Sequence, residues 1–187
     1  MFESLAARLE GRVVTLEPLE PEHEDGLRAA AADEQVWRWM ITRDVGAWIG
    51  DALSDNPDRQ PFAVLHGGEV IGSTSYMSLA PEHRRLEIGN TWLTSSAWGT
   101  GANVEAKLLQ LTHAFETWGC RRVELKTDAL NERSRGAIEA LGAHFEGIHR
   151  KHQLVRGGEN RDTAWYAIFD DDWPSVRSRL EGRLQQS

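Results

Sequence analysis

The chain has 187 residues, of which 40% are hydrophobic and 27% charged, and its formal net charge at pH 7 is −8. This composition is typical of a soluble globular protein, and we expect a single domain over residues 1–187. The acidic balance argues against a nucleic-acid partner, because nucleic-acid-binding proteins usually carry a basic face. The single Cys120 excludes an intramolecular disulfide, and no apolar run reaches about 18 residues, so we expect a cytoplasmic protein without a membrane span.

The first half of the chain predicts a strand, then helices, then three further strands. Prolines end the first strand, and Gly67-Gly68 between two strand-like runs is typical of a hairpin turn. In the strand that follows, alternation places Glu87 on the same face as Thr91 and Leu93. The expected bounds are a strand at 11–20, one or two helices within 22–53, a hairpin at 62–79 and a strand at 84–96.

The second half alternates helix and strand. Apolar residues recur at steps of three and four through 103–118, which predicts a helix that Gly119 ends. Hairpins combined with strand–helix–strand crossovers predict an α/β fold, in which a mixed sheet has helices on both faces. The remaining expected elements are a strand at 121–130, a helix at 131–143, two strands around "RGGEN" and a terminal helix at 171–184.

Two glycines, Gly99 and Gly101, precede the long helix. A helix N-terminus has unpaired N–H groups and partial positive charge, and glycines let a bulky anion approach that backbone. The segment therefore predicts a phosphate cradle, although a tight turn alone would use the same residues. It is neither a dinucleotide fingerprint, which would need glycine in place of Val104, nor a P-loop, because no Gly-Lys-Ser/Thr triplet occurs.

The start of the second helix gives a weaker signal of the same kind. Asn131 and Ser134 are three residues apart, so in a first helical turn their side chains lie on roughly the same side. The pair is also typical of an ordinary helix cap. Two helix starts that follow successive strands at one end of a sheet can line a single crevice.

The segments "AWGTGANVEAK" and "NERSRGAIEALGA" resemble the GNAT acetyltransferases, in particular the ribosomal-protein N-acetyltransferase branch, and the order of elements is similar over nearly the whole chain. The family signature is Gln/Arg-x-x-Gly-x-Gly/Ala, and Ser96 stands at its first position, which is a departure. The resemblance implies the GNAT fold, a twisted, mostly antiparallel sheet of six to seven strands. It also implies acetyl-CoA as the cosubstrate and an amine as the acceptor.

The resemblance further implies the parts of the donor site. Pantetheine would pair with the strand end and hydrogen-bond to Asn131, while Ser134 would lie near the sulfur and donate to the departing thiolate. Strand amides around Leu93 would stabilise the oxyanion. The backbone residues implied for the pyrophosphate are Trp98, Gly99, Thr100, Gly101, Ala102 and Asn103, and those implied for pantetheine are Trp92, Leu93 and Thr94.

The general base is the least determined part. Glu87 is the first candidate, with a solvated edge carboxylate as the alternative, and His152 is the second. An α-amine with a pKa of about 7.8 is far more often neutral at pH 7 than a lysine near 10.4, which favours a protein N-terminus or another weakly basic small amine. No His/Cys cluster has metal-ligand spacing, so no metal is expected.

Other residues give open alternatives. Lys107 is expected to lie on the surface, either near phosphate oxygens or with no such role. Trp37, Trp39 and Trp92 could form a wall of an acceptor pocket or belong to the core, whereas Trp118, Trp173 and Cys120 are expected to be buried. The variable 33–58 region and the turn near Gly157 are expected to form the acceptor pocket. The resemblance also favours a homodimer. Two alternatives to an acetyltransferase remain, a CoA-binding sensor or scaffold without transfer activity and an acyltransferase with a different acyl donor.

Overall fold

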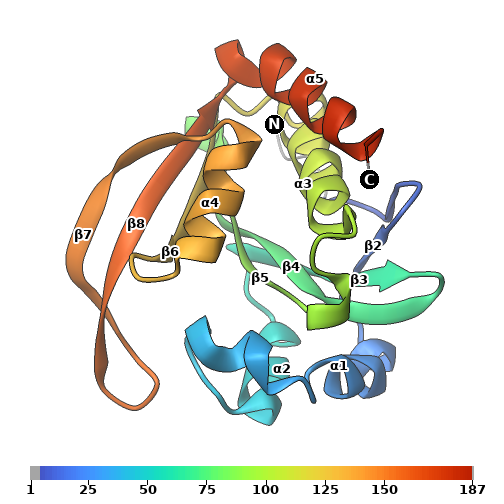
Figure 1. Ribbon diagram of the computed structural model, residues 1–187, viewed down its shortest axis with the longest axis vertical. Helices are drawn as coiled ribbons and strands as arrows, with labels where there is room; N and C mark the ends of the chain where they lie inside the picture. Colours follow the sequence, from blue (N-terminus) through green and yellow to red (C-terminus); the bar gives the residue numbers. More distant parts are fainter. Residues whose placement is uncertain (1–4, 187) are drawn as a thin grey trace.

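The structure is a computed structural model that describes residues 5–186 (Figure 1). Its strands form one sheet of eight in the order β1-β2-β3-β4-β5-β6-β8-β7. Neighbouring strands are antiparallel except β5 and β6, which run parallel. The bounds are β1 (Leu9–Glu10), β2 (Thr15–Pro18), β3 (Arg59–His66), β4 (Glu69–Ala80), β5 (Arg85–Leu93), β6 (Arg122–Asp128), β7 (His144–Val155) and β8 (Glu159–Phe169).

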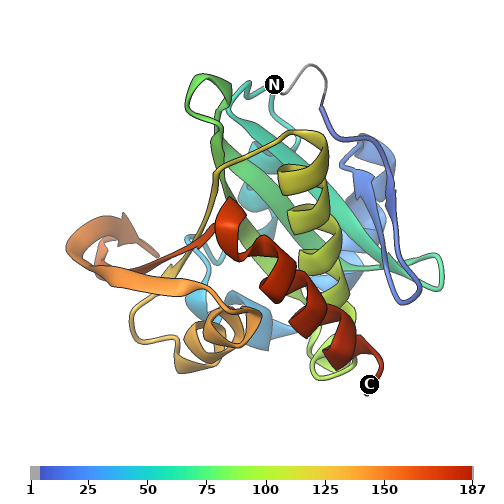
Figure 2. The ribbon, with the colours of Figure 1, turned by 90° about the horizontal axis from the view of Figure 1, so that it is seen from above.

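Helices cover both faces of the sheet. On one face lie α1 and α2, and on the other lie α3, α4 and α5, with α3 and α5 side by side (Figures 1 and 2). Short 3-10 segments join several elements, and a π-helical turn, His113–Thr117, extends α3. The helices are α1 (Glu24–Ala30), α2 (Val45–Ala52), α3 (Ala102–Thr112), α4 (Glu132–Leu141) and α5 (Trp173–Leu184).

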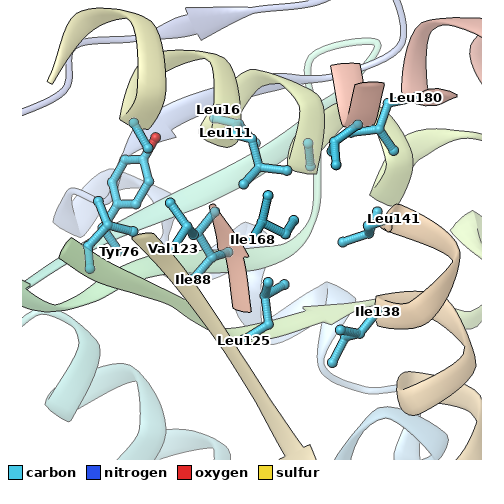
Figure 3. Packing of buried hydrophobic residues seen from close by; sticks show 14 of the residues in the cluster. Leu16, Tyr76, Ile88, Leu111, Val123, Leu125, Ile138, Leu141, Ile168 and Leu180 are labelled. Atoms are coloured by element: carbon cyan, nitrogen blue, oxygen red, sulfur yellow. The ribbon is translucent and has the colours of Figure 1, made fainter. Parts of the chain in front are cut away.

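The hydrophobic core has two parts, one on each side of the sheet. The larger part lies beneath α3, α4 and α5, where Leu111, Ile138 and Leu180 meet side chains of the central strands (Figure 3). The smaller part joins α1, α2 and the segment Glu34–Trp39 to Trp92 of β5. Burial on both faces makes the central strands the most enclosed elements of the fold.

The predicted fold class is confirmed, with two differences in detail. The sheet has eight strands rather than six or seven, because a two-residue strand, β1, precedes β2. The single strand expected at 11–20 is interrupted: the Glu105 carboxylate accepts the N–H groups of Arg12, Val13 and Val14 at 2.9, 2.6 and 2.7 Å. These amides bind a helix side chain instead of a neighbouring strand, so the chain turns between β1 and β2.

Candidate active site

The site begins where two parallel strands separate. β5 and β6 pair only from Arg85–Ile88 to Arg122–Leu125. Further along, residues 89–93 pair with β4 alone and residues 126–128 with β8 alone among the residues described. The arm made of β6, β8 and β7 thus diverges from β5 (Figure 1). The facing edges present backbone groups that an extended ligand can pair with.

A β-bulge shapes the open half of β5. Gly89 faces Ser75 and Trp92 faces Ser73, so Asn90 and Thr91 together oppose the single residue Thr74. Asn90 has a φ of 48°, in the left-handed region. The extra residue reverses the side-chain alternation, because one residue of shift moves every later side chain to the other face. The expectation that Glu87, Thr91 and Leu93 share a face is therefore wrong: Thr91 and Leu93 face α3, and Glu87 faces away from it.

The same alternation decides which backbone groups reach the open edge. The Thr94 N–H donates to Ile71 O at 2.8 Å, so Thr94 and Trp92 direct their amides to β4. Leu93 directs its amide and carbonyl to the open edge, where Trp98 Nε1 donates to its carbonyl at 2.9 Å. Of the three residues expected to contact pantetheine, Leu93 has the backbone orientation for it.

The predicted phosphate cradle lies at the N-terminus of α3. Gly99 and Gly101 have φ of 78° and 85°, a conformation that side chains disfavour. Gly101 is the N-cap residue and has no side chain to satisfy the first amides of α3. Thr100 Oγ1 donates to Ala97 O at 2.7 Å, which closes the turn. The turn at 98–103 therefore presents amides and a helix dipole without a competing side-chain cap, the arrangement that binds phosphate.

The N-terminus of α4 lies next to this cradle. Asn131 is buried, and its Oδ1 accepts the Ser134 N–H at 3.2 Å, so the expected cap is confirmed. The Arg133 guanidinium lies 3.4 Å from the ring centroid of Trp98, which joins the two helix starts directly. Burial lowers the pKa of Arg133. Cradle and cap are thus parts of one site.

Glu87 lies on the other side of the sheet. Its side chain is buried, and Oε2 accepts a hydrogen bond from Lys126 Nζ at 2.7 Å. Lys126 also lies 3.8 Å from the ring centroid of Trp165 and 3.6 Å from Glu124. The alternative of a solvated edge carboxylate is wrong, because Glu87 belongs to a buried ion pair at the point where β5 and β6 part.

His152 is close enough to this group to interact with it electrostatically. Its Nδ1 lies 3.1 Å from Thr163 Oγ1, and its ring packs edge-on against Trp165 with centroids 5.1 Å apart. Burial lowers the pKa of His152, and the positive charges of His149 and Lys126 lower it further. The imidazole is therefore neutral at pH 7 and able to accept a proton. Trp165 and His149 are not among the residues predicted from the sequence, although alternation along the two arm strands could have paired them.

The segments expected to form an acceptor pocket meet in the structure. The Arg156 N–H donates to Ile41 O at 2.9 Å, and its Nη1 donates to Met40 O at 3.2 Å. Arg156 also lies 3.5 Å from Asp128, at the end of β6. The cavity there has a volume of about 470 Å³ and is lined by Ile41, Thr42, Arg43, Leu154, Val155, Arg156, Gly157 and Gly158.

Comparison with known proteins decides the family. Residues 14–144 match the model of the acetyltransferase (GNAT) domain. The chain belongs to the GNAT acetyltransferases. A structure from T. thermophilus, assigned as an acetyltransferase, is 41% identical, covers 97% of this chain and 98% of that one, and has a TM-score of 0.88.

Two further relatives bear on the branch of the GNAT family. "Putative ribosomal N-acetyltransferase YdaF" of Bacillus subtilis (strain 168) is 30% identical over 110 residues, which span 59% of this chain and 59% of that protein. Mycobacterium smegmatis RimJ, solved in complex with CoA-disulfide, shares the fold with a TM-score of 0.78 at 23% identity, covering 94% of this chain and 91% of its own. The resemblance to the ribosomal N-acetyltransferase branch is thereby confirmed.

Several residues of this GNAT chain differ from expectation. Lys107 is only 5% exposed, so its expected surface position is wrong. Trp37 and Trp92 pack with Trp48 in the smaller core, with the centroids of Trp37 and Trp48 at 5.4 and 5.3 Å from that of Trp92, and Trp39 alone of the three candidates is partly exposed. The expected burial of three others, Trp118, Trp173 and Cys120, is confirmed.

Cys120 is also chemically quiet, because burial raises the pKa of its thiol to about 12. Among residues 5–186, no group of three or more His, Cys, Asp or Glu side chains is placed to hold a metal ion. No helix in this part of the chain has the length and hydropathy needed to cross a bilayer.

Proposed function

We propose that the protein is an N-acetyltransferase that moves an acetyl group from acetyl-CoA directly to a primary amine. The observation that carries the proposal is the open, bulged half of β5 next to the glycine turn of α3. An extended thioester arm has a strand edge to pair with, and its pyrophosphate has a helix N-terminus to bind. Membership of the GNAT family supports the same donor.

In this proposal the donor is bound mainly by backbone. The amides at 98–103 bind the pyrophosphate, and Leu93 pairs with the pantetheine arm at the open edge. Asn131 retains an amide NH₂ for the arm while its oxygen caps α4. Arg133, which stacks on Trp98 between the two helix starts, covers the arm from the side.

The transfer itself requires three aids. The acceptor nitrogen attacks the thioester carbon, the new C–N bond forms, and collapse of the tetrahedral intermediate breaks the C–S bond. Amides at the bulge and at Leu93 stabilise the oxyanion, and the Ser134 hydroxyl donates to the departing thiolate. A thiol with a pKa of about 8.5 leaves readily, so Ser134 assists without being indispensable. The proton of the attacking amine passes to Glu87 or His152, or to water.

The acceptor enters from the face opposite α3, where Glu87, His152 and the cavity beside Arg156 lie. A protein N-terminal α-amine is the first candidate, since it is the more often neutral amine at pH 7, and a small amine is the second. The name of the Bacillus subtilis relative favours testing ribosomal-protein N-termini first. We place this reaction in the cytoplasm, in a protein that can form a homodimer.

One observation favours a second candidate function. The Glu87 carboxylate is already bound to Lys126, and a site without a working base would bind CoA as a sensor or scaffold. The deciding experiment measures thiol release from acetyl-CoA in the presence of N-terminal peptides and small amines, with mass spectrometry of the products. We expect amine-dependent thiol release and an acetylated amine. Tight acetyl-CoA binding without thiol release across the panel would establish the sensor, and faster turnover of a longer acyl-CoA would establish a different donor.

A further inference from the structure

Lys107 is a buried cation for which the proposed mechanism has no use. It lies on the second turn of α3, and its side chain points into the protein, toward the sheet. Its Nζ donates to three oxygens: Thr91 Oγ1 at 2.7 Å, Thr74 Oγ1 at 3.0 Å and Gln110 Oε1 at 3.2 Å. An ammonium has three N–H donors, so these acceptors match the protonated form completely.

The burial of Lys107 is unusual because no opposite charge accompanies it. Among the residues described, no carboxylate forms an ion pair with its ammonium, and loss of solvent is what lowers the pKa of Lys107, to about 7. A buried ammonium without a counter-ion is costly, and an apolar side chain of similar length would fill the same space more cheaply. Such groups concentrate at functional sites.

The position of the network gives it a purpose. Thr74 is the one residue of β4 that faces the bulge, and Thr91 is one of the two residues in the bulge. Their hydroxyl oxygens lie 2.7 Å apart, and Lys107 binds both. The network therefore joins the two sides of the irregularity. Asn90, which adopts the disfavoured left-handed conformation, is adjacent to Thr91.

We infer that Lys107 is a positioning residue for acetyl transfer: through Thr91 and Thr74 it fixes the bulge of β5 in the shape that presents its amides to the acyl oxygen. The inference rests on the proposed function. The ammonium also places positive charge behind the peptide groups that face the oxyanion, where low dielectric strengthens its effect. Neither role requires Lys107 to touch the substrate.

Loss of the Lys107 proton changes this arrangement. A neutral amine has two N–H donors and one lone pair, so the Thr91 hydroxyl turns toward Nζ to donate to it. In the protonated state that hydroxyl is directed to Thr74 or, at 3.4 Å, to the Gly89 carbonyl within the bulge. The shape of the bulge thus depends on the charge of Lys107.

Other titratable groups near Lys107 keep one charge state around neutral pH. From β4, Tyr76 donates to the Gln110 carbonyl, and burial raises its pKa far above its ordinary value. From the end of α3, His113 has a pKa lowered by burial, so it is neutral. Glu105, on the opposite side of α3, is held by the amides of residues 12–14. From β5, the facing group is the Thr91 hydroxyl, which does not titrate in this range.

The first test compares the wild type with Lys107→Met and Thr91→Val. We expect kcat to fall about tenfold or more in both variants, with the acetyl-CoA dissociation constant unchanged within about twofold, because the phosphate cradle is intact. In the wild type, kcat declines above pH 7, and this decline disappears in Lys107→Met. The thermal midpoint of Lys107→Met does not fall, since a buried charge is removed. A normal kcat, or a lower thermal midpoint together with an unchanged pH profile, would overturn the inference.

The second test does not depend on turnover. In a ¹H–¹⁵N NMR titration of the full chain, the amides of Gly89, Asn90 and Thr91 should shift with one midpoint near 7 and should not shift in Lys107→Met. His152→Asn serves as the control and should retain the titration, because the pKa of His152 lies lower. Amides that stay flat in the wild type would contradict the role of Lys107. Absence of both acetyl-CoA binding and thiol release, with the titration present, would instead overturn the proposed function alone.

Discussion

The two halves of β5 contrast within nine residues. The first half, Arg85–Ile88, has a strand on each side, and Leu86 and Ile88 are buried in the main core. The second half, 89–93, has one neighbour, a bulge and a polar network with a buried lysine behind it. The first half has the pairing and packing that stabilise a fold, whereas the second half leaves backbone groups available to a ligand.

The contrast shows how one strand separates stability from binding. Regular pairing on both sides leaves no free backbone group, so the first half cannot bind a substrate. The second half has open backbone groups and a strained residue, which the rigid first half and β4 hold in place. Substitutions in the two halves should therefore affect different measurements.

The largest effect is expected in the closed half. Leu86→Ala removes a fully buried side chain and should lower the free energy of unfolding by about 3 kcal/mol, within the usual range for such truncations. Chemical denaturation measures this loss. At a temperature where the variant is folded, its acetyl-CoA affinity should equal that of the wild type. Parallel loss of stability and affinity would show that the halves are not separable.

The next effect concerns the cradle beside the open half. Gly101→Glu places a carboxylate where phosphate is proposed to bind and should weaken acetyl-CoA binding by about a hundredfold or more, about 2.7 kcal/mol. Gly101→Asn controls for the backbone conformation, since asparagine tolerates a φ of 85° without adding charge. Gly182→Glu adds the same charge in open space on α5 and should bind normally. Unchanged affinity in Gly101→Glu would remove the cradle from the account.

Ser134→Ala tests a side chain that faces the open half from α4. Loss of one hydrogen bond to the departing thiolate should lower kcat about tenfold, about 1.4 kcal/mol, while the dissociation constant of acetyl-CoA is unchanged. Steady-state kinetics with calorimetry separates the two quantities. Complete loss of turnover would mean that Ser134 does more than assist the leaving group.

The smallest effect is expected at the link between the acceptor segment and the end of β5. The Ser95 N–H donates to Asp33 Oδ2 at 2.8 Å, and hydrogen bonds from Ser95 lower the pKa of Asp33 below its ordinary 3.8. A lowered folded-state pKa means that the carboxylate adds stability above the unfolded-state pKa and loses it as pH falls through the folded-state pKa. Asp33→Asn should therefore lower the thermal midpoint slightly at pH 7 and not at pH 2. An equal decrease at both pH values would exclude the charge as the cause.

Much of the donor side could be predicted from the sequence because it depends on local features. Gly99 and Gly101 give the turn, and Asn131 gives the cap, each within a few residues. The resemblance to the GNAT family then connected these two helix starts. Such features need no knowledge of distant contacts.

The bulge and the acceptor side could not be predicted in the same way. Nothing in "RRLEIGNTWL" marks the extra residue, yet it reverses the faces of Thr91 and Leu93 and lets Lys107 reach the strand from α3. The ion pair of Glu87 with Lys126 joins strands 39 positions apart. Such contacts depend on register and tertiary packing, which local periodicity does not contain.

The central claim is that the open half of β5 and the glycine turn together bind acetyl-CoA. Calorimetric titration of the purified protein with acetyl-CoA, and separately with CoA and ATP, tests it most directly. The account predicts micromolar affinity for acetyl-CoA and no binding of ATP, which lacks the arm that pairs with the strand edge. Absence of acetyl-CoA binding would contradict the account, because the two helix starts would then be only a turn and a cap.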